Sequence, residues 1–154
     1  MNIGIIIYSR TGNTLLVGER LKDSLHTGGH LVNLERVTAI NEAPNTKEPI
    51  ILKTIPDLSA YDYIILGAPV QGFSLSAIFK VYLEQIPDFR EKTIGCFVTE
   101  HFPKAWMGGN HSIKQMMNLI KQKGGVMKET GVVNWSSKSR EEQIEDVLVR
   151  LCRI

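Results

Sequence analysis

The residues best suited to chemistry form a short polar run near the start of the chain. Three hydroxyls, one amide and one glycine fall within six positions: Ser9, Arg10, Thr11, Gly12, Asn13 and Thr14. The run lies between an apolar stretch and a stretch with helical spacing, so backbone N–H groups and the positive end of a helix dipole converge on it. Gly12 allows close approach of the backbone, and the hydroxyls can donate to phosphate oxygens. We therefore predict a phosphate-binding loop. The alternative is a helix cap that binds nothing, although a cap needs only one such residue.

The class of phosphate ligand is narrowed by the motifs that the sequence lacks. It has no G-x-x-x-x-G-K-[ST] motif for nucleoside triphosphates and no G-x-G-x-x-G motif for dinucleotides. A mononucleotide is then the simplest ligand.

Other chemistries receive little support. His101 and His111 are ten positions apart without a cysteine nearby, and Gly28-Gly29 prevents His26 and His30 from sharing a helix face. We predict no metal site. No Ser-His-Asp set, activated cysteine or carboxylate pair is visible, so no catalytic residue is assigned.

The elements that must position these residues alternate between apolar runs and helical spacing. The apolar runs cover 2–8, 31–37, 61–67, 92–99 and 126–135. Helices are predicted after Thr14, after Ser76, from a capping Asn110, and from a capping box of Ser139 with Glu142. This alternation predicts an α/β fold with a parallel sheet, the run at 31–37 lying nearer an edge. The length of 154 residues suits a single domain over 1–154.

Residues 38–57 are the least regular part. They include Pro44, Pro49 and Pro56 and show little periodicity, so a full-length helix is doubtful there.

The first strand with its [ST]-x-T-G-N-T loop resembles the flavodoxin family, in which this loop binds the phosphate of FMN. The order of elements matches the family over nearly the whole chain. The resemblance implies a flavodoxin-like, doubly wound, five-stranded parallel sheet of order 2-1-3-4-5 with helices on both faces. It also implies FMN as the cofactor.

The resemblance extends to a second loop over 68–76. Pro69, Val70, Gln71, Gly72 and Phe73 would contact the flavin. In the family, a glycine at the position of Gly72 often lets a peptide flip, so that its carbonyl accepts a hydrogen bond from reduced flavin N5. Phe73 is either a neighbour of the ring or a core side chain under the next helix.

A third loop, which is long for its position, has the aromatic and glycine content of the family's second flavin-flanking loop. The candidate contacts are Thr99, Glu100, His101, Phe102, Trp106, Gly108 and Gly109. Phe102 or Trp106 would stack on the isoalloxazine ring, and the sequence leaves that choice open.

The stretch from His101 to Lys128 contains no Asp or Glu. Its five lysines are Lys104, Lys114, Lys121, Lys123 and Lys128. They form either an ordinary solvated face or a docking site for an acidic redox partner protein, or for the phosphates of NADPH, near Lys104 and Lys114.

These observations favour an FMN-binding carrier that shuttles electrons between redox partners. The alternative is an FMN-dependent NAD(P)H oxidoreductase resembling quinone reductases of the same fold. A flavin-free signalling domain ranks lower, because 9–14 offers no acidic cluster.

With 18 Lys and Arg against 16 Asp and Glu, we expect no nucleic-acid partner. Short apolar runs and the absence of a basic leader predict no membrane segment and a cytoplasmic location. We expect a monomer or weak dimer.

Overall fold

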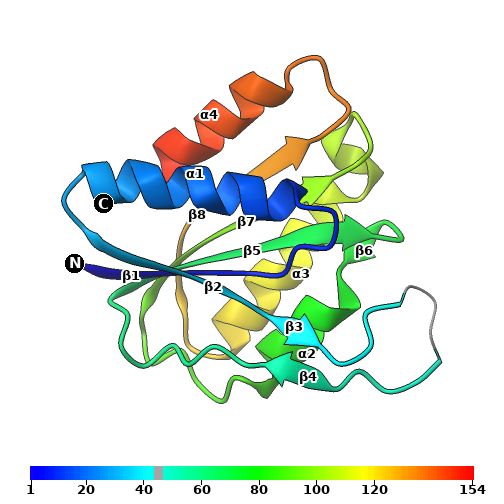
Figure 1. Cartoon of the computed structure of the whole chain (residues 1–154), viewed down its shortest axis with the longest axis horizontal. Coiled ribbons are helices and arrows are strands. Elements are labelled where there is room, and N and C mark those ends of the chain that lie inside the picture. The colour runs from blue at the N-terminus through cyan, green and yellow to red at the C-terminus, as the bar shows by residue number, and fades with distance from the viewer. Residues whose placement is uncertain (44–46) are drawn as a thin grey trace.

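The computed structural model describes residues 1–43 and 47–154, and its centre is a parallel β-sheet. The long strands are β1 (Asn2–Ile7), β2 (Leu31–Arg36), β5 (Tyr63–Gln71), β7 (Thr93–Glu100) and β8 (Val126–Asn134). They lie in the order β2-β1-β5-β7-β8 (Figure 1). This arrangement confirms the predicted order 2-1-3-4-5 and the position of β2 at an edge.

Helices cover both faces of the sheet. Helices α1 (Asn13–Thr27) and α4 (Arg140–Leu151) lie on one face, and α2 (Ala77–Gln85) and α3 (Gly109–Gln122) lie on the other (Figure 1). Ile3, Ile5 and Ile7 of β1 pack towards α1 and α4, whereas Ile6 packs towards α2 and α3. Two covered faces explain why β1 is apolar at nearly every position.

Two predicted helix caps are wrong in detail. Helix α3 begins at Gly109 with Gly108 as its N-cap, so Asn110 lies inside the first turn. Ser139 does occupy the N-cap position of α4, but its side chain makes no capping bond. Its φ of −95° and ψ of 17° differ from the extended backbone that aims an N-cap hydroxyl at the helix.

The segment between β2 and β5 contains two short strands that the sequence did not reveal. β3 (Thr38–Ala39) and β4 (Leu52–Thr54) pair antiparallel as a separate small sheet. The described residues of 38–57 contain no helix, as predicted; Pro44 lies outside the described residues. Strands of two and three residues are too short to show periodicity.

The second predicted loop is mostly strand. β5 continues to Gln71, and Pro69 still pairs with Thr99 of β7. The chain then turns at Gly72 and Phe73 and returns as β6 (Ser74–Leu75), which pairs antiparallel with the end of β5. The loop expected at 68–76 is therefore a tight hairpin. None of the helices in the described residues is long and apolar enough to cross a membrane.

Candidate functional site

The three predicted loops meet at the edge formed by the carboxyl ends of the strands, on the right in Figure 1. The Oγ1 atoms of Thr14 and Thr99 are 2.8 Å apart, which joins the first loop to the end of β7. The rings of Phe73 and Phe102 stack at 4.9 Å, which joins the second loop to the third. The fold thus brings all three segments together where open α/β sheets bind ligands.

The first loop presents unpaired donors. Ser9 is buried; its Oγ accepts from Leu15 N at 3.1 Å, and its carbonyl accepts from Arg36 Nη2 at 3.1 Å. In 1–43 and 47–154, no hydrogen bond is donated by the backbone N–H groups of residues 10–14. These groups stand at the positive end of α1, which favours an anion.

Position 12 favours glycine because of its backbone conformation, and not because a side chain there would clash with its neighbours. Its φ is +98°, in the left-handed region, and a Cβ there would meet nothing within 4 Å. Arg10 and Thr11 beside it are exposed. The loop is thus open to solvent, with side chains able to reach a bound phosphate, so its residues fit that group.

A hollow of about 440 Å³ lies beside this loop. It is lined by Ser9, Arg10, Arg36, Thr38, Glu42 and Ala43. The sequence prediction missed the last four of these. Arg36 could have been found, because it ends the strand predicted at 31–37 and so belongs to the same edge of the sheet.

In the second segment, Gly72 and Phe73 have φ of +59° and +63°. The Phe73 side chain is 55% exposed, so it is not the core side chain that one interpretation placed under the next helix. Gln115 of α3 holds this hairpin in place, since its Oε1 accepts from Ser74 Oγ at 2.9 Å and from Leu75 N at 2.8 Å.

Of the two candidate stacking residues, Phe102 faces the second segment. Its ring is 6° from parallel to that of Phe73. Trp106 lies in a 3₁₀ turn, η1 (Ala105–Met107), is 76% exposed, and stacks on no aromatic ring of the described chain. A flat ligand that enters between the two segments must separate Phe73 from Phe102.

Glu100 is the unusual residue of the third segment. It is 2% exposed, and neither carboxyl oxygen makes a hydrogen bond of ordinary geometry to a described residue. Burial raises its pKa to about 7, and the nearby backbone N–H of Gly109 has the smaller, opposite effect. Next in the chain, His101 is exposed, and its carbonyl accepts from Ser136 N at 3.3 Å.

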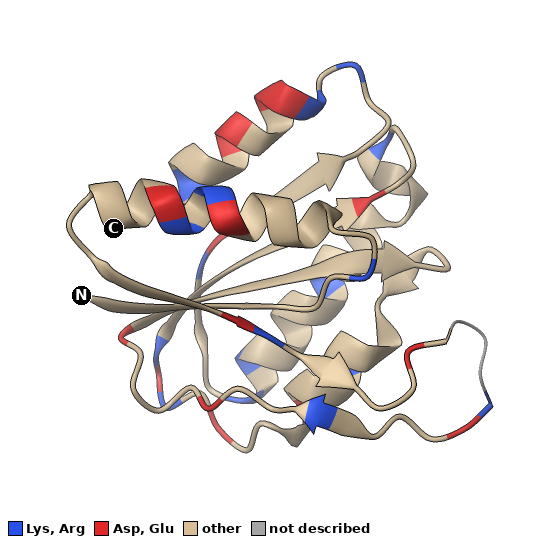
Figure 2. Cartoon of the chain, viewed as in Figure 1, with Lys and Arg blue, Asp and Glu red and all other residues tan. Residues whose placement is uncertain are grey.

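The five lysines of 101–128 are spread over the third segment, α3, the turn after it and β8 (Figure 2). Lys123 Nζ donates to the carbonyls of Glu84 and Ile86 at 2.9 and 2.6 Å. Lys128 Nζ lies 5.3 Å from the centre of the Tyr63 ring. Lys128 is nevertheless exposed, as are Lys104, Lys114 and Lys121.

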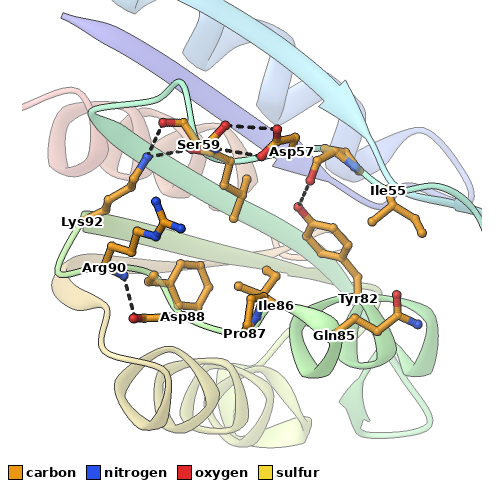
Figure 3. Close-up of a pocket in the computed structure, with 13 residues that line it drawn as sticks. Ile55, Asp57, Ser59, Tyr82, Gln85, Ile86, Pro87, Asp88, Arg90 and Lys92 are labelled. Atoms are coloured by element: carbon orange, nitrogen blue, oxygen red, sulfur yellow. Dashed lines mark hydrogen bonds between the residues drawn. The ribbon is translucent and has the colours of Figure 1, made fainter.

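A second hollow, of about 510 Å³, lies at the opposite edge, between residues 55–59 and the turn that follows α2 (Figure 3). Several of its polar groups are already engaged by the chain itself. Lys92 Nζ donates to the carbonyls of Leu58, Ser59 and Tyr61 at 2.9, 2.9 and 2.8 Å, and Tyr82 donates to the Pro56 carbonyl. This hollow therefore gives no sign of cofactor chemistry. Across the described residues, no group of three His, Cys, Asp or Glu could hold a metal ion.

No protein-family model matches the chain, and no curated protein matches it. Solved structures do. The two-electron reduced flavodoxin of Megasphaera elsdenii is 17% identical, with a TM-score of 0.72 and 99% of each chain covered. Oxidised Flavodoxin 2 of Bacillus cereus is 20% identical, with a TM-score of 0.69, over 98% of this chain and 97% of that one. A WrbA-like flavodoxin of Agrobacterium tumefaciens is 17% identical, with a TM-score of 0.68, over 98% of this chain and 94% of that one.

Sequence identities this low show only that the fold is shared. TM-scores of 0.69 and 0.72 over 98% and 99% of this chain show that the architecture is shared. The chain has the flavodoxin fold.

Proposed function

We propose that this protein binds FMN at the carboxyl edge of the sheet and carries electrons between redox partner proteins. The observation that carries the proposal is the open loop before α1, with its unpaired backbone N–H groups and the left-handed Gly12. When bound, FMN supplies the electron-transfer chemistry, and the chain supplies binding, orientation and electrostatics.

The phosphate is held by the first loop. Its N–H groups and the α1 dipole compensate the charge, and the hydroxyl of Thr11 is free to donate. Arg10 is exposed beside the loop and adds a mobile positive charge.

The ring lies between the second and third segments. Phe73 of the second segment and Phe102 of the third stack on each other there, and a ring that enters between the segments parts them and takes the place of this stacking contact. Trp106 follows Phe102 closely in the third segment. The contact set is Pro69, Val70, Gln71, Gly72, Phe73, Thr99, Glu100, His101, Phe102, Trp106, Gly108 and Gly109. Gly72 has φ of +59°, and glycine is the residue at which a peptide rotates at least cost.

Nothing in the described residues favours the alternative of an NAD(P)H oxidoreductase. One of the five lysines that could meet a nicotinamide phosphate, Lys123, is already engaged by two carbonyls.

A pair of glycine variants tests the phosphate site. Gly12 and Gly29 both have positive φ, +98° and +89°, and both have open space at the Cβ position. Replacing either with alanine strains the backbone to a similar degree, but only Gly12 lies at the site. We expect Gly12→Ala to weaken FMN binding about tenfold or more, because relaxing the positive φ turns loop N–H groups away from the phosphate, and losing one charge-assisted hydrogen bond costs about that much. Riboflavin, which lacks the phosphate, should lose little affinity.

Gly29→Ala is the control and should leave both ligands unaffected. Equal losses of FMN and riboflavin in Gly12→Ala would contradict the phosphate assignment. Failure of the folded parent protein to bind either flavin would overturn the proposed function itself.

The carrier role is tested by following the visible spectrum of the FMN-loaded protein during stepwise anaerobic reduction. Two separated one-electron stages are expected for a carrier. Direct bleaching in a single two-electron stage would support the oxidoreductase instead.

The docking face is tested through charge. We place an acidic redox partner near the exposed Lys104 and Lys114. Reversal of either charge to Glu should slow reduction by an acidic electron-transfer protein at low salt, and the difference should shrink as salt rises. Lys22→Glu is the control, because Lys22 is exposed on α1, on the other side of the sheet. An equal effect of all three variants would exclude this face.

A further inference from the structure

Glu100 lies at the floor of the proposed ring site. It is the last residue of β7 and pairs with Asn134 at the end of β8. Its neighbour Thr99 points towards α1, where it meets Thr14. Since strand side chains alternate, Glu100 points towards α2 and α3, the side to which Cys96 and Val98 also point.

The carboxyl group fits beneath the first turn of α3. A Cβ on Gly109 would be 2.9 Å from Glu100 Oε1, so the absence of that side chain makes room for the carboxyl. A Cβ on Gly108, one residue earlier, would be 2.9 Å from the Phe73 backbone and 3.0 Å from Val70. Glu100 is therefore covered by the junction of the second and third segments, which the ring must enter.

The surroundings offer polar atoms without partners. Besides both oxygens of Glu100, Ser112 Oγ of α3 and Asn134 Oδ1 of β8 are buried and make no hydrogen bond within the described parts of the chain. Buried polar atoms usually have partners, so a cluster without them is unusual. A carboxylate in such a place is costly unless it is paired or takes a proton.

No charged side chain nearby explains the raised pKa of Glu100, whose causes are burial and the smaller opposing effect of the Gly109 N–H. The titratable groups on the third segment, α3 and β8 are His101, Lys104, His111, Lys114, Lys121, Lys128 and Glu129. All of them are exposed except Glu129, which is half-buried, and the exposed Lys128 lies over the Tyr63 ring. The proton on Glu100 is therefore governed by the burial of the carboxyl and by the polar groups placed against it.

On the basis of the proposed function, we propose that flavin binding is linked to protonation of Glu100. A ring placed between the second and third segments would present carbonyl oxygens, which accept hydrogen bonds. Such acceptors favour the neutral acid, which can donate, over the carboxylate, which cannot. The site consequently takes up a proton from solvent when it binds flavin at a pH where Glu100 is ionised.

The test measures the affinity for riboflavin between pH 5.5 and 8.5, because riboflavin has no phosphate to titrate in this range. The parent protein should bind equally well below about pH 6. It should lose up to about tenfold in affinity for each pH unit above 7, the limit for one linked proton. Glu100→Gln should bind with little pH dependence, because an amide can donate at every pH. Glu84→Gln, a change at an exposed carboxylate on α2, should behave as the parent does.

A second measurement uses the unmodified protein and does not depend on the folding of a variant. Calorimetry of riboflavin binding at pH 8, in two buffers with different heats of ionisation, gives the number of protons taken up. A value approaching one supports the linkage. Zero uptake with a pH-independent affinity overturns it while leaving FMN binding intact. Absence of flavin binding at every pH overturns the proposed function, and the linkage with it.

Discussion

Thr14 and Thr99 form a buried hydroxyl pair across the sheet edge, with their Oγ1 atoms 2.8 Å apart. They lie 85 positions apart in the chain. Thr14 belongs to the first turn of α1, and Thr99 to the end of β7. One bond thus connects the proposed phosphate loop to the strand that leads into the third segment.

Removing either hydroxyl should destabilise the fold. Thr14→Val or Thr99→Val leaves the other hydroxyl buried without a partner, which costs about 1–2 kcal/mol. The double variant should cost little more than either single one, because no unpaired hydroxyl remains. Urea unfolding of the four proteins measures this coupling, and simple addition of the two losses would contradict the pair.

Position 73 should prefer glycine to alanine. Phe73 has φ of +63°, which costs a residue with a Cβ about 1 kcal/mol and costs glycine little. Both replacements lose the stacking on Phe102, so the difference between their unfolding free energies reports only the strain of the backbone at this position. We expect Phe73→Gly to be more stable than Phe73→Ala by about 1 kcal/mol in chemical denaturation. The opposite order would show that the turn relaxes.

Burial of Glu100 should make the stability of the flavin-free protein depend on pH. Its pKa is raised from 4.5 to about 7 in the folded state. Above pH 7 the group is charged in both states, so the folded state bears the full burial cost. Between pH 7 and 4.5 the folded state holds a proton that the unfolded state has lost, so stability increases as pH falls.

The full difference is at most about 3 kcal/mol, the free energy equivalent of that shift. Glu100→Gln removes it. The unfolding free energy of the variant minus that of the parent should therefore increase between pH 5 and pH 8. A constant difference would mean that the carboxyl is not buried in solution.

Lys92 should contribute to the stability of the fold and not to the affinity for flavin. Its ammonium group donates to three carbonyls of residues 58–61, which fastens the chain before β5 to the start of β7. Lys92→Met should lower the free energy of unfolding by about 1–3 kcal/mol, because three acceptors lose a charged donor. Thermal unfolding measures the loss. Lys121→Met, at an exposed lysine, should change stability by less than about 0.5 kcal/mol. A changed flavin affinity in Lys92→Met would contradict the separation of the two edges.

The sheet could be predicted because its signals are local and strong. The apolar runs around Ile5, Ile65 and Val98 are buried on both faces, and such strands have few alternatives. The position of the polar run at 9–14, between β1 and α1, could be predicted for the same reason, and its role in binding phosphate stays a prediction. Neither signal depends on knowing which segments touch.

The features that were missed depend on distant contacts. Whether Pro69 belongs to a loop or to a strand is decided by its pairing with Thr99, which local sequence does not reveal. The choice of Gly108 over Asn110 as the cap of α3 follows from its close packing on Phe73. Glu100 was identified as a loop residue, but its burial results from the placement of α3 above it. The lysines at 123 and 128 looked free for the same reason, because their partners lie on other elements.

The strand order also has a consequence for synthesis of the chain. Ile3 of β1 pairs with Tyr63 of β5, so the first strand remains without its inner neighbour until some sixty further residues have been made. β2, which pairs with β1 from the other side, appears much earlier and leaves one edge of that pair open. Because long-range pairings are slow to form, an apolar segment with an open edge stays exposed on the ribosome throughout this interval. The nascent chain is therefore most prone to aggregation before residue 63 emerges.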